Sequence, residues 1–146
     1  MISFVIRQAR PEDRARITAL LDGASLPTGG LTEHLGTFLV AERNQDILGA
    51  IGLESYGDSG LLRSAVVDAA FRNEGIGSSL YSELLVLART AGMRKLLLLT
   101  TTAEEYFRRK GFQVIDRAKV EGPITQSEEF RGACPESAVC MELLLL

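Results

Sequence analysis

The sequence has little of what metal sites and disulfide frameworks require. It contains two cysteines, Cys134 and Cys140, and a single histidine, His34. A structural zinc site needs about four ligands, so these residues do not provide one. The cysteines do not form a C-x-x-C motif, and we expect two free thiols in a reducing cytoplasm rather than a disulfide.

Long apolar runs and strong charge of one sign are also missing. No stretch approaches the roughly 20 apolar residues that cross a bilayer. The N-terminal segment has no cleavage-like site, so we expect neither a membrane partner nor a signal peptide. The formal net charge of −3 offers no general field for nucleic acid. An anion would have to be held locally, by backbone amides or a small basic cluster.

What the chain does contain is the composition of one globular domain. Its 146 residues are 46% hydrophobic and 24% charged, which is typical of a folded protein with one core. No repeat, low-complexity tract or interdomain linker interrupts it. We therefore predict a single domain over residues 1–146.

The order of predicted elements indicates an α+β protein. Apolar spacing and turn residues define these elements. They are a strand at 2–7, a helix from 11 to 24, a short helix at 31–35, strands at 37–42, 47–56 and 61–67, a helix at 76–91, a strand at 95–100, a short helix from 103, and strands at 112–116 and 137–142. A capping box at 102–105 is expected to start the last helix. An antiparallel meander followed by a β-α-β crossover predicts a mostly antiparallel mixed sheet with flanking helices.

The most informative segment joins the meander to the long helix. It reads VVDAAFRNEGIG over residues 66–77. Gly75 and Gly77 let the backbone approach a ligand closely, and the amides from Asn73 to Ser78 are free donors at a helix N-terminus. This combination is typical of a pyrophosphate cradle. A glycine-containing turn without a ligand remains the alternative.

A dinucleotide-binding fingerprint fits this segment less well. That fingerprint requires G-x-G-x-x-G directly after the strand and an acidic residue for the ribose. Here the glycines come later, and the next strand ends in Thr100.

The strand, loop, R-x-x-G-x-G and helix together resemble motif A of the GNAT N-acetyltransferase superfamily. The segment YFRRKGF at 106–112 is similar to the family's Y-x-x-x-G-F segment. The resemblance extends over nearly the whole chain. It implies the GNAT fold with a splayed strand pair, acetyl-CoA as co-substrate, and direct transfer of the acetyl group to an amine.

Two groups within the superfamily are most similar. LLTTTAEEYF at 98–107 is similar to the acetyltransferase domain of N-acetylglutamate synthases. The segments at 25–31, 52–58, 61–64 and 135–139 resemble the arsenic-resistance N-acetyltransferases. This resemblance implies a small amino-acid-like acceptor, such as an arsenic- or phosphorus-containing glutamate analogue.

The resemblance places the coenzyme at the cradle and along the preceding strand. The pantetheine arm would pair with that strand as an added strand, and a bulge would splay the strand from its neighbour. A backbone amide near Val66 would stabilise the developing oxyanion. The side chain of Glu74 departs from the family pattern and is expected to face solvent. The predicted coenzyme-binding residues are Ala65, Val66, Val67, Arg72, Asn73, Glu74, Gly75, Ile76, Gly77, Ser78, Thr100 and Phe107.

Two residues are predicted to take part in proton transfer. An α-ammonium has a pKa of about 8, so a carboxylate acting through water suffices as the base. We predict Glu54 for this role, with a solvated or capping carboxylate as the alternative. Phe107 stands where the family usually has its tyrosine acid. Tyr106 lies one residue earlier, about 100° around a helix, so it is expected to point elsewhere, and water is expected to protonate the thiolate.

Four residues are predicted to contact the acceptor. Arg63 would pair with a carboxylate, and Ser64 lies beside it. Ser137 matches a serine of the N-acetylglutamate synthases, but Pro135 replaces their nearby arginine, which argues against glutamate itself. His34 would line the acceptor cleft, with a structural or surface role as the alternative.

Two other functions remain open at this point. One is an acyl-CoA-binding sensor without turnover, which Phe107 would suit, and the other is a protein N-terminal acetyltransferase. The sequence identifies no acceptor and no oligomeric state. A homodimer formed through exposed sheet edges is a further expectation.

Overall fold

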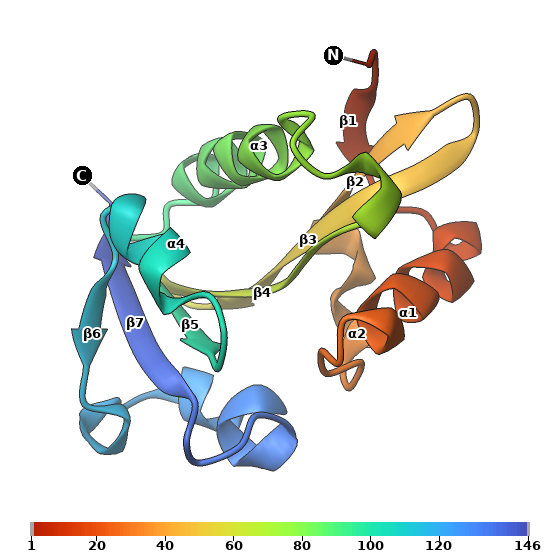
Figure 1. The fold of residues 1–146 in the computed structure, drawn as a ribbon. Coiled ribbons are helices and arrows are strands. Elements are labelled where there is room, and N and C mark those ends of the chain that lie inside the picture. The colour runs from red at the N-terminus through yellow and green to blue at the C-terminus, as the bar shows by residue number, and fades with distance from the viewer. Residues whose placement is uncertain (1, 146) are drawn as a thin grey trace.

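A seven-stranded sheet forms the centre of the computed structural model, which describes residues 2–145. The strand order is β1-β2-β3-β4-β5-β7-β6 (Figure 1). The strands are β1 (Val5–Gln8), β2 (Phe38–Arg43), β3 (Asp46–Tyr56), β4 (Ser59–Val67), β5 (Lys95–Thr100), β6 (Gln113–Ile115) and β7 (Val139–Leu144). The helices are α1 (Arg14–Gly23), α2 (Leu31–His34), α3 (Ile76–Thr90) and α4 (Glu104–Arg109), with short 3-10 turns at Pro11–Asp13, Leu35–Thr37, Ala69–Phe71, Arg117–Lys119 and Pro123–Gln126 and a π-helical turn η6 at Glu129–Ala133.

The predicted fold class and element order are confirmed. Strands β1 to β4 form an antiparallel meander, β4 and β5 are parallel around α3, and β7 inserts between β5 and β6. The capping box predicted at 102–105 is not formed, because α4 begins at Glu104 with Ala103 as its N-cap. Instead, Thr100 at the end of β5 accepts hydrogen bonds from the amides of Thr102 and Ala103 at 3.3 and 2.9 Å.

Helices cover both faces of the sheet. Helices α3 and α4 lie on one face, and α1 and α2 lie on the other (Figure 1). Successive strand residues point to opposite faces, so neighbours such as Leu96 and Leu97 belong to different clusters of the core. The face opposite α3 is covered in the C-terminal half by the loop between β6 and β7. The free thiols of Cys134, in this loop, and Cys140, on β7, are buried there.

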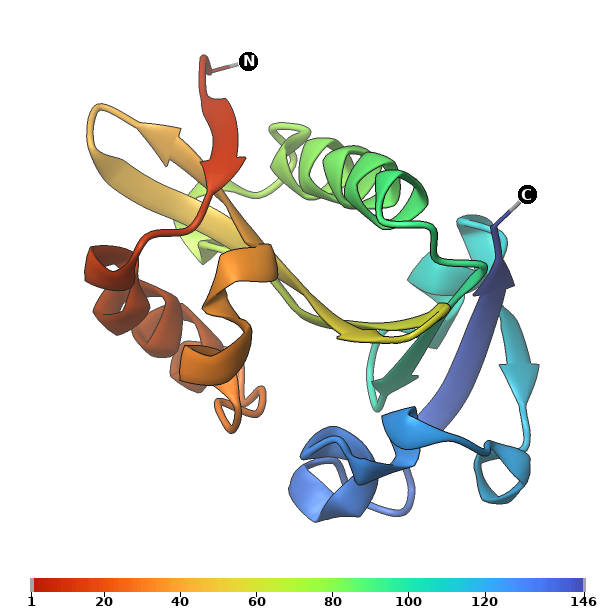
Figure 2. The same ribbon diagram turned by 180° about the vertical axis from the view of Figure 1, so that it is seen from behind.

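The sheet opens between β4 and β5. Their pairing covers only Ser59 to Leu61 against Lys95 to Leu97. A bulge in β4, with Ser64 in the left-handed region at φ 59°, shifts its register against β3 and bends the strand. Beyond the bulge the two strands separate (Figure 2). The predicted splayed pair is therefore present.

One row of residues across β2, β3 and β4 prepares the site at this opening. Phe38 pairs with Gly52, and Gly52 pairs with Arg63. The buried Phe38 ring lies over Gly52 and contacts the guanidinium of Arg63. The distance from Arg63 Cζ to the centroid of the Phe38 ring is 5.6 Å. A Cβ on Gly52 would lie 2.3 Å from Phe38 Cζ. Glycine is thus required here for close approach and not for a special backbone angle.

Replacing Gly52 with alanine should destabilise the fold. The added methyl overlaps a ring with no free space, so we expect Gly52→Ala to lower the free energy of unfolding by about 1–3 kcal/mol. Urea denaturation would measure this. Gly23→Ala is the control, because nothing lies within 4 Å of its Cβ, and it should be neutral or stabilising by up to about 1 kcal/mol. Equal stability of the two variants would contradict the packing of Phe38 on Gly52.

Candidate functional site

A cavity of about 910 Å³ occupies the opening between β4 and β5. Its walls come from β4, the loop after it, the first turns of α3, the end of β5, α4, the loop after α1, and the segment around η6. The volume lies near the upper end of the range for small-molecule sites. The cavity has two chemically different ends, a backbone cradle at α3 and a buried ionic cluster around Arg63.

The cradle is formed by the turn that leads into α3. Asn73 and Gly75 have φ angles of 67° and 79°, and such left-handed residues turn successive amides toward one side. The first amide bonded within the helix is that of Ser79, which donates to the Gly75 carbonyl at 3.1 Å. The amides of residues 76–78 precede it and are free donors at the positive end of a 15-residue helix.

Gly77 leaves room for a ligand beside these amides. A Cβ at this position would lie 3.7 Å from Val67 Cγ2 and 3.8 Å from the Tyr106 hydroxyl. Both are ordinary van der Waals distances, so packing within the chain does not require glycine here. The missing side chain instead leaves the backbone open to the cavity. The cradle therefore fits a diphosphate approached by main-chain amides.

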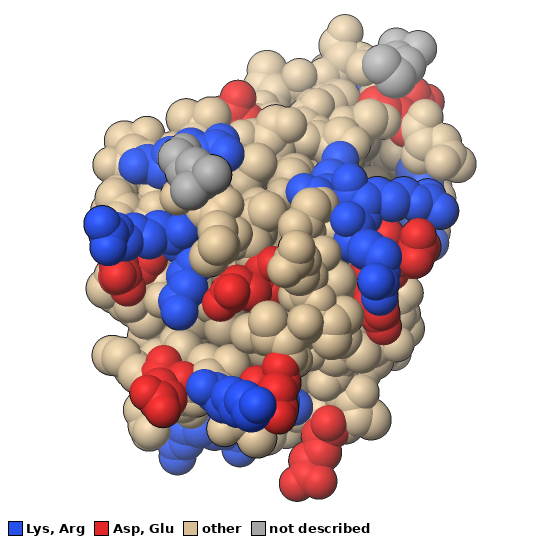
Figure 3. All heavy atoms as spheres, turned by 90° about the vertical axis from the view of Figure 1, so that its left-hand side faces the viewer, with Lys and Arg blue, Asp and Glu red and all other residues tan. Residues whose placement is uncertain are grey.

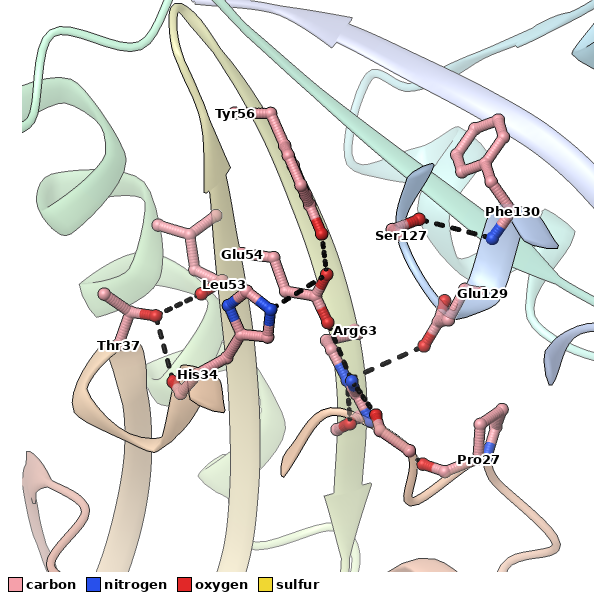
Figure 4. Close-up of polar contacts among 12 residues, drawn as sticks. Pro27, His34, Thr37, Leu53, Glu54, Tyr56, Arg63, Ser127, Glu129 and Phe130 are labelled. Atoms are coloured by element: carbon pink, nitrogen blue, oxygen red, sulfur yellow. Dashed lines mark hydrogen bonds and ion pairs between the residues drawn. The ribbon is translucent and has the colours of Figure 1, made fainter. Parts of the chain in front are cut away.

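At the other end, Arg63 is completely buried and its donors are engaged. Its guanidinium donates to Glu54 at 2.7 Å, to the Ser64 hydroxyl at 2.9 Å and to the Pro27 carbonyl at 3.2 Å, and it also bonds the Gly29 carbonyl (Figure 4). Two of these partners belong to the loop after α1. Arg63 thus ties that loop to the centre of the sheet.

Glu54 is the centre of the polar contacts on β3. Besides Arg63, the Tyr56 hydroxyl donates to its carboxylate, and His34 Nε2 lies 3.6 Å away (Figure 4). Burial, and then the hydrogen bond to Glu54, raises the pKa of Tyr56. Its hydroxyl therefore keeps its proton and remains a donor. The Glu54 side chain is only 1% exposed.

Comparison with known proteins identifies the family to which this chain belongs. A model of the "Acetyltransferase (GNAT) domain" matches residues 34–114. The chain belongs to the GNAT acetyltransferase family. An amino-acid acetyltransferase from Mycobacterium tuberculosis is 31% identical over 141 residues, which cover 89% of this chain and 77% of that protein. One from Azotobacter vinelandii is 33% identical over 85 residues, covering 57% of this chain and 20% of the relative.

Solved GNAT structures share the fold over the whole chain. N-acetylglutamate synthase from Neisseria gonorrhoeae, solved with coenzyme A and N-acetyl-glutamate, superposes with a TM-score of 0.85 at 23% identity, covering 100% of this chain and 36% of that one. A Mycobacterium tuberculosis protein solved with CoA gives 0.81 at 27% identity, with 97% and 99% covered. The chain spans about a fifth to a third of the length of the first curated relatives, at 20% and 30%.

In this GNAT domain, the structure brings together nearly all residues predicted to bind the coenzyme. Glu74 alone among them lies outside the cavity wall, and its side chain is half-buried. Those that line the cavity are Ala65, Val66, Val67, Arg72, Asn73, Gly75, Ile76, Gly77, Ser78, Thr100 and Phe107.

The predicted acceptor and catalytic residues are separated by the structure. Arg63 and Ser64 line the cavity, whereas Glu54 and His34 do not. Glu54 is turned toward Arg63 and Tyr56, and its role as a base acting through water stays a prediction. His34 lies 3.6 Å from Glu54 and outside the cavity wall.

Ser137 also lies outside the cavity. It is exposed in the turn before β7, and the next residue, Ala138, is buried and lines the cavity instead. Ser137 lies in a turn that the Ala138 amide closes by donating to the Pro135 carbonyl at 3.0 Å, and its side chain is directed to solvent there. The predicted contact between Ser137 and the acceptor is therefore not supported by this arrangement.

Tyr106 and Phe107 both line the cavity, although their rings are perpendicular, with centroids 5.1 Å apart. Phe107 is buried against Phe112, whereas Tyr106 is 42% exposed and places its hydroxyl near Gly77. Tyr106 therefore lies at the cradle end. Its predicted catalytic role stays a prediction.

The outer face of α4 carries paired charges. Arg108 lies beside Glu104 and Glu105, and Arg109 beside Glu105. Blue and red side chains are correspondingly mixed on the face shown in Figure 3. Such exposed pairs provide little net field, so the basic run 108–110 does not form a separate anion site.

Tyr81 and Glu129 are among the cavity residues that reasoning from the sequence missed. Tyr81 follows Gly77 by four residues and so shares its helix face, a spacing that would have identified it. Its hydroxyl is buried and finds no hydrogen-bond partner among residues 2–145, and burial raises its pKa. Glu129 lies in a loop whose sequence has no periodicity, and only the fold brings it to the cavity.

Cys134 lines the cavity as a buried thiol. Burial raises the pKa of its thiol to about 12, and the nearby Glu129 carboxyl adds to this. The thiolate, which is the reactive form, is therefore scarce at neutral pH. This is consistent with direct transfer without an acyl-enzyme.

Removing the Tyr81 hydroxyl should not harm the fold. A buried hydroxyl without a partner costs about 1–3 kcal/mol, so we expect Tyr81→Phe to raise the free energy of unfolding. Tyr56→Phe is the matched control, because it removes a hydroxyl bonded to Glu54, and it should destabilise by about 1–2 kcal/mol. Denaturant unfolding of both variants would measure the difference. Equal losses would show that Tyr81 has a partner in the folded chain.

Proposed function

We propose that this chain is an acetyl-CoA-dependent N-acetyltransferase whose acceptor is the amine of a small amino-acid-like molecule. The observation that carries the proposal is the single cavity that joins the open cradle at Gly77 to the buried cluster at Arg63. The relatives named amino-acid acetyltransferases and the structural neighbours solved with coenzyme A support it.

In this proposal the chain holds the coenzyme mainly through its backbone. The amides of residues 76–78 would bind the diphosphate. The edge of β4 beyond Leu61, which does not pair with β5, would pair with the pantetheine arm as an added strand. Tyr81, with its unpartnered hydroxyl on the same wall, would supply a further donor. The bound thioester supplies the activated acetyl group.

The residues at the opening would orient the acceptor and exclude water. The nitrogen must be neutral to attack the thioester carbon, so the chain must accept one proton from an ammonium. A free amide on the β4 edge near Val66 would donate to the developing oxyanion, and one such donor can contribute about 3 kcal/mol. A thiol has a pKa of about 8.5, so coenzyme A leaves without demanding a strong acid. Water would return a proton to the sulfur.

The acceptor end limits which amino acids fit. Arg63 and Ser64 line the cavity, but Arg63 already binds Glu54 and two carbonyls. An acceptor carboxylate would have to share this guanidinium. We propose an amino acid with a free α-amine, and glutamate analogues containing arsenic or phosphorus are the finer candidates. The free, buried thiols of Cys134 and Cys140 suit a reducing compartment such as the cytoplasm.

An acceptor screen tests the proposal directly. The protein is mixed with acetyl-CoA and one acceptor at a time, and released coenzyme A is detected with a thiol reagent. The panel contains the common amino acids, arsenic and phosphorus analogues of glutamate, and a short peptide with a free N-terminus. We expect thiol release only with acceptor, and with free amino acids rather than the peptide. Tight coenzyme binding without turnover would instead indicate a sensor, and turnover on the peptide alone a protein N-terminal acetyltransferase.

A larger side chain at Gly77 should block coenzyme binding without unfolding the protein. Space for it exists only in the cavity, so we expect Gly77→Leu to weaken binding of coenzyme A at least tenfold, which corresponds to about 1.4 kcal/mol. Ser82→Leu, on the exposed face of the same helix, is the control and should bind normally. Calorimetric titration would measure both. Unchanged affinity in Gly77→Leu would show that the cradle does not hold the coenzyme.

A further inference from the structure

A second buried carboxylate faces the cavity from the C-terminal loop. Glu129 is the first residue of η6, is 3% exposed, and lines the cavity that Glu54 does not reach. Figure 4 shows it extending toward Arg63 from the side opposite Glu54. The chain thus places two acidic groups on one arginine, and only one of them faces the ligand space.

The two carboxylates differ in how well they are paired. Glu54 takes a 2.7 Å hydrogen bond from Arg63 and another from Tyr56. Glu129 Oε2 lies 3.7 Å from Arg63 Nε, which is longer than a hydrogen bond. Arg63 therefore neutralises Glu54 first, and the Glu129 carboxylate keeps its capacity to accept a proton.

The other groups around Glu129 do not neutralise it. Cys134, just after η6, stays a neutral thiol, and Glu54 on β3 repels a second negative charge. Arg117 lies nearby, but its guanidinium is engaged by the backbone carbonyls of residues 129, 130 and 135. Burial accordingly raises the pKa of Glu129 from 4.5 to about 7, although Arg63 lowers it in part.

We propose that Glu129 is the group that removes the proton from the acceptor's ammonium at the cavity, while Glu54 acts as a positioning residue that holds Arg63. This rests on the proposed acetyltransferase function. The Glu129 carboxylate first pairs with the ammonium and takes one of its protons. The neutral nitrogen then forms the C–N bond to the acetyl carbon, and the C–S bond breaks with its electron pair leaving on sulfur. The second nitrogen proton is lost to water, and the thiolate is protonated from water.

This assignment also predicts which amines are used. A proton acceptor with a pKa near 7 lies about one unit below an α-ammonium and about three units below a side-chain ammonium of lysine. Proton transfer to Glu129 therefore costs less free energy from an α-ammonium than from the side-chain ammonium of lysine. Free lysine should be acetylated on its α-nitrogen.

The test compares Glu129→Gln, Glu129→Asp and Glu128→Gln in the full chain, using the best acceptor from the screen. Glu128 is the adjacent, exposed carboxylate and serves as the matched control. The wild type should lose kcat roughly tenfold per pH unit below about pH 7. Glu129→Gln should lose at least a hundredfold in kcat, within the range of general-base effects of roughly 10²–10⁴, and should not show this pH dependence. Glu129→Asp should recover part of the rate together with the pH dependence, and Glu128→Gln should match the wild type.

Thermal unfolding supplies a readout independent of activity. Because the raised pKa makes the folded chain bind more protons than the unfolded chain between about pH 4.5 and 7, the wild type should lose stability as pH rises through this window. Glu129→Gln lacks this loss, so its melting temperature relative to the wild type should increase with pH. A constant difference would show that the carboxyl is not held neutral by burial, which would overturn the inference.

The outcomes separate this inference from the proposed function. If the wild type and Glu128→Gln turn over and Glu129→Gln keeps the same rate and pH profile, Glu129 is not the base, although the chain is an acetyltransferase. If Glu129→Gln fails to bind coenzyme A, its defect is structural and the assignment is wrong. If the wild type binds coenzyme A but acetylates no amine, the proposed function fails and the role of Glu129 fails with it.

Discussion

The separation of β4 from β5 is the constraint on which the rest of the site depends. Only three residue pairs join these parallel strands before the bulge at Ser64 turns β4 away. In a sheet that stayed closed, the β4 amides would form hydrogen bonds with β5, and no cavity would remain between the two strands. The opening instead exposes a strand edge, connects it to the N-terminus of α3, and places Arg63 at the inner end. One local irregularity thus creates both the binding edge and the space beside it.

Opening a sheet exposes polar groups inside the fold, and the ionic cluster shows how they are satisfied. Arg63 sits where β4 bends and is supported by the Phe38 ring, which Gly52 admits. Its bonds to Glu54 and to the loop after α1 fix the inner wall. A buried charge without a partner is costly, and Arg63 is paired with Glu54 and donates to three further oxygen acceptors. Glu129 is the second carboxyl group beside Arg63, and burial raises its pKa. The site is therefore rigid on the β3 side and chemically available on the side of η6.

Much of the fold could be predicted because its signals are local. The apolar alternation of the meander and the helical spacing between Ile76 and Ala91 depend only on neighbouring residues, and both elements formed where expected. The cradle is also local, since Asn73, Gly75 and Gly77 lie within five residues. The misplacements were of side-chain direction. Glu54 lies on the expected strand but points toward Arg63 and Tyr56, and Ser137, predicted to begin a strand, lies in the turn before β7. The direction of such side chains depends on register and on neighbours distant in sequence.

The sequence by itself determined the element order, the family and the backbone turn at the start of α3, because the signals for each come from residues close together along the chain. Only the tertiary structure decided which acidic side chain pairs with Arg63 and which one faces the cavity. Glu54, Arg63 and Glu129 come from β3, β4 and η6, and their spacing in the chain says nothing of which carboxylate the arginine bonds. That choice is set by packing, which brings Glu54 within hydrogen-bond distance and leaves Glu129 at 3.7 Å, facing the cavity.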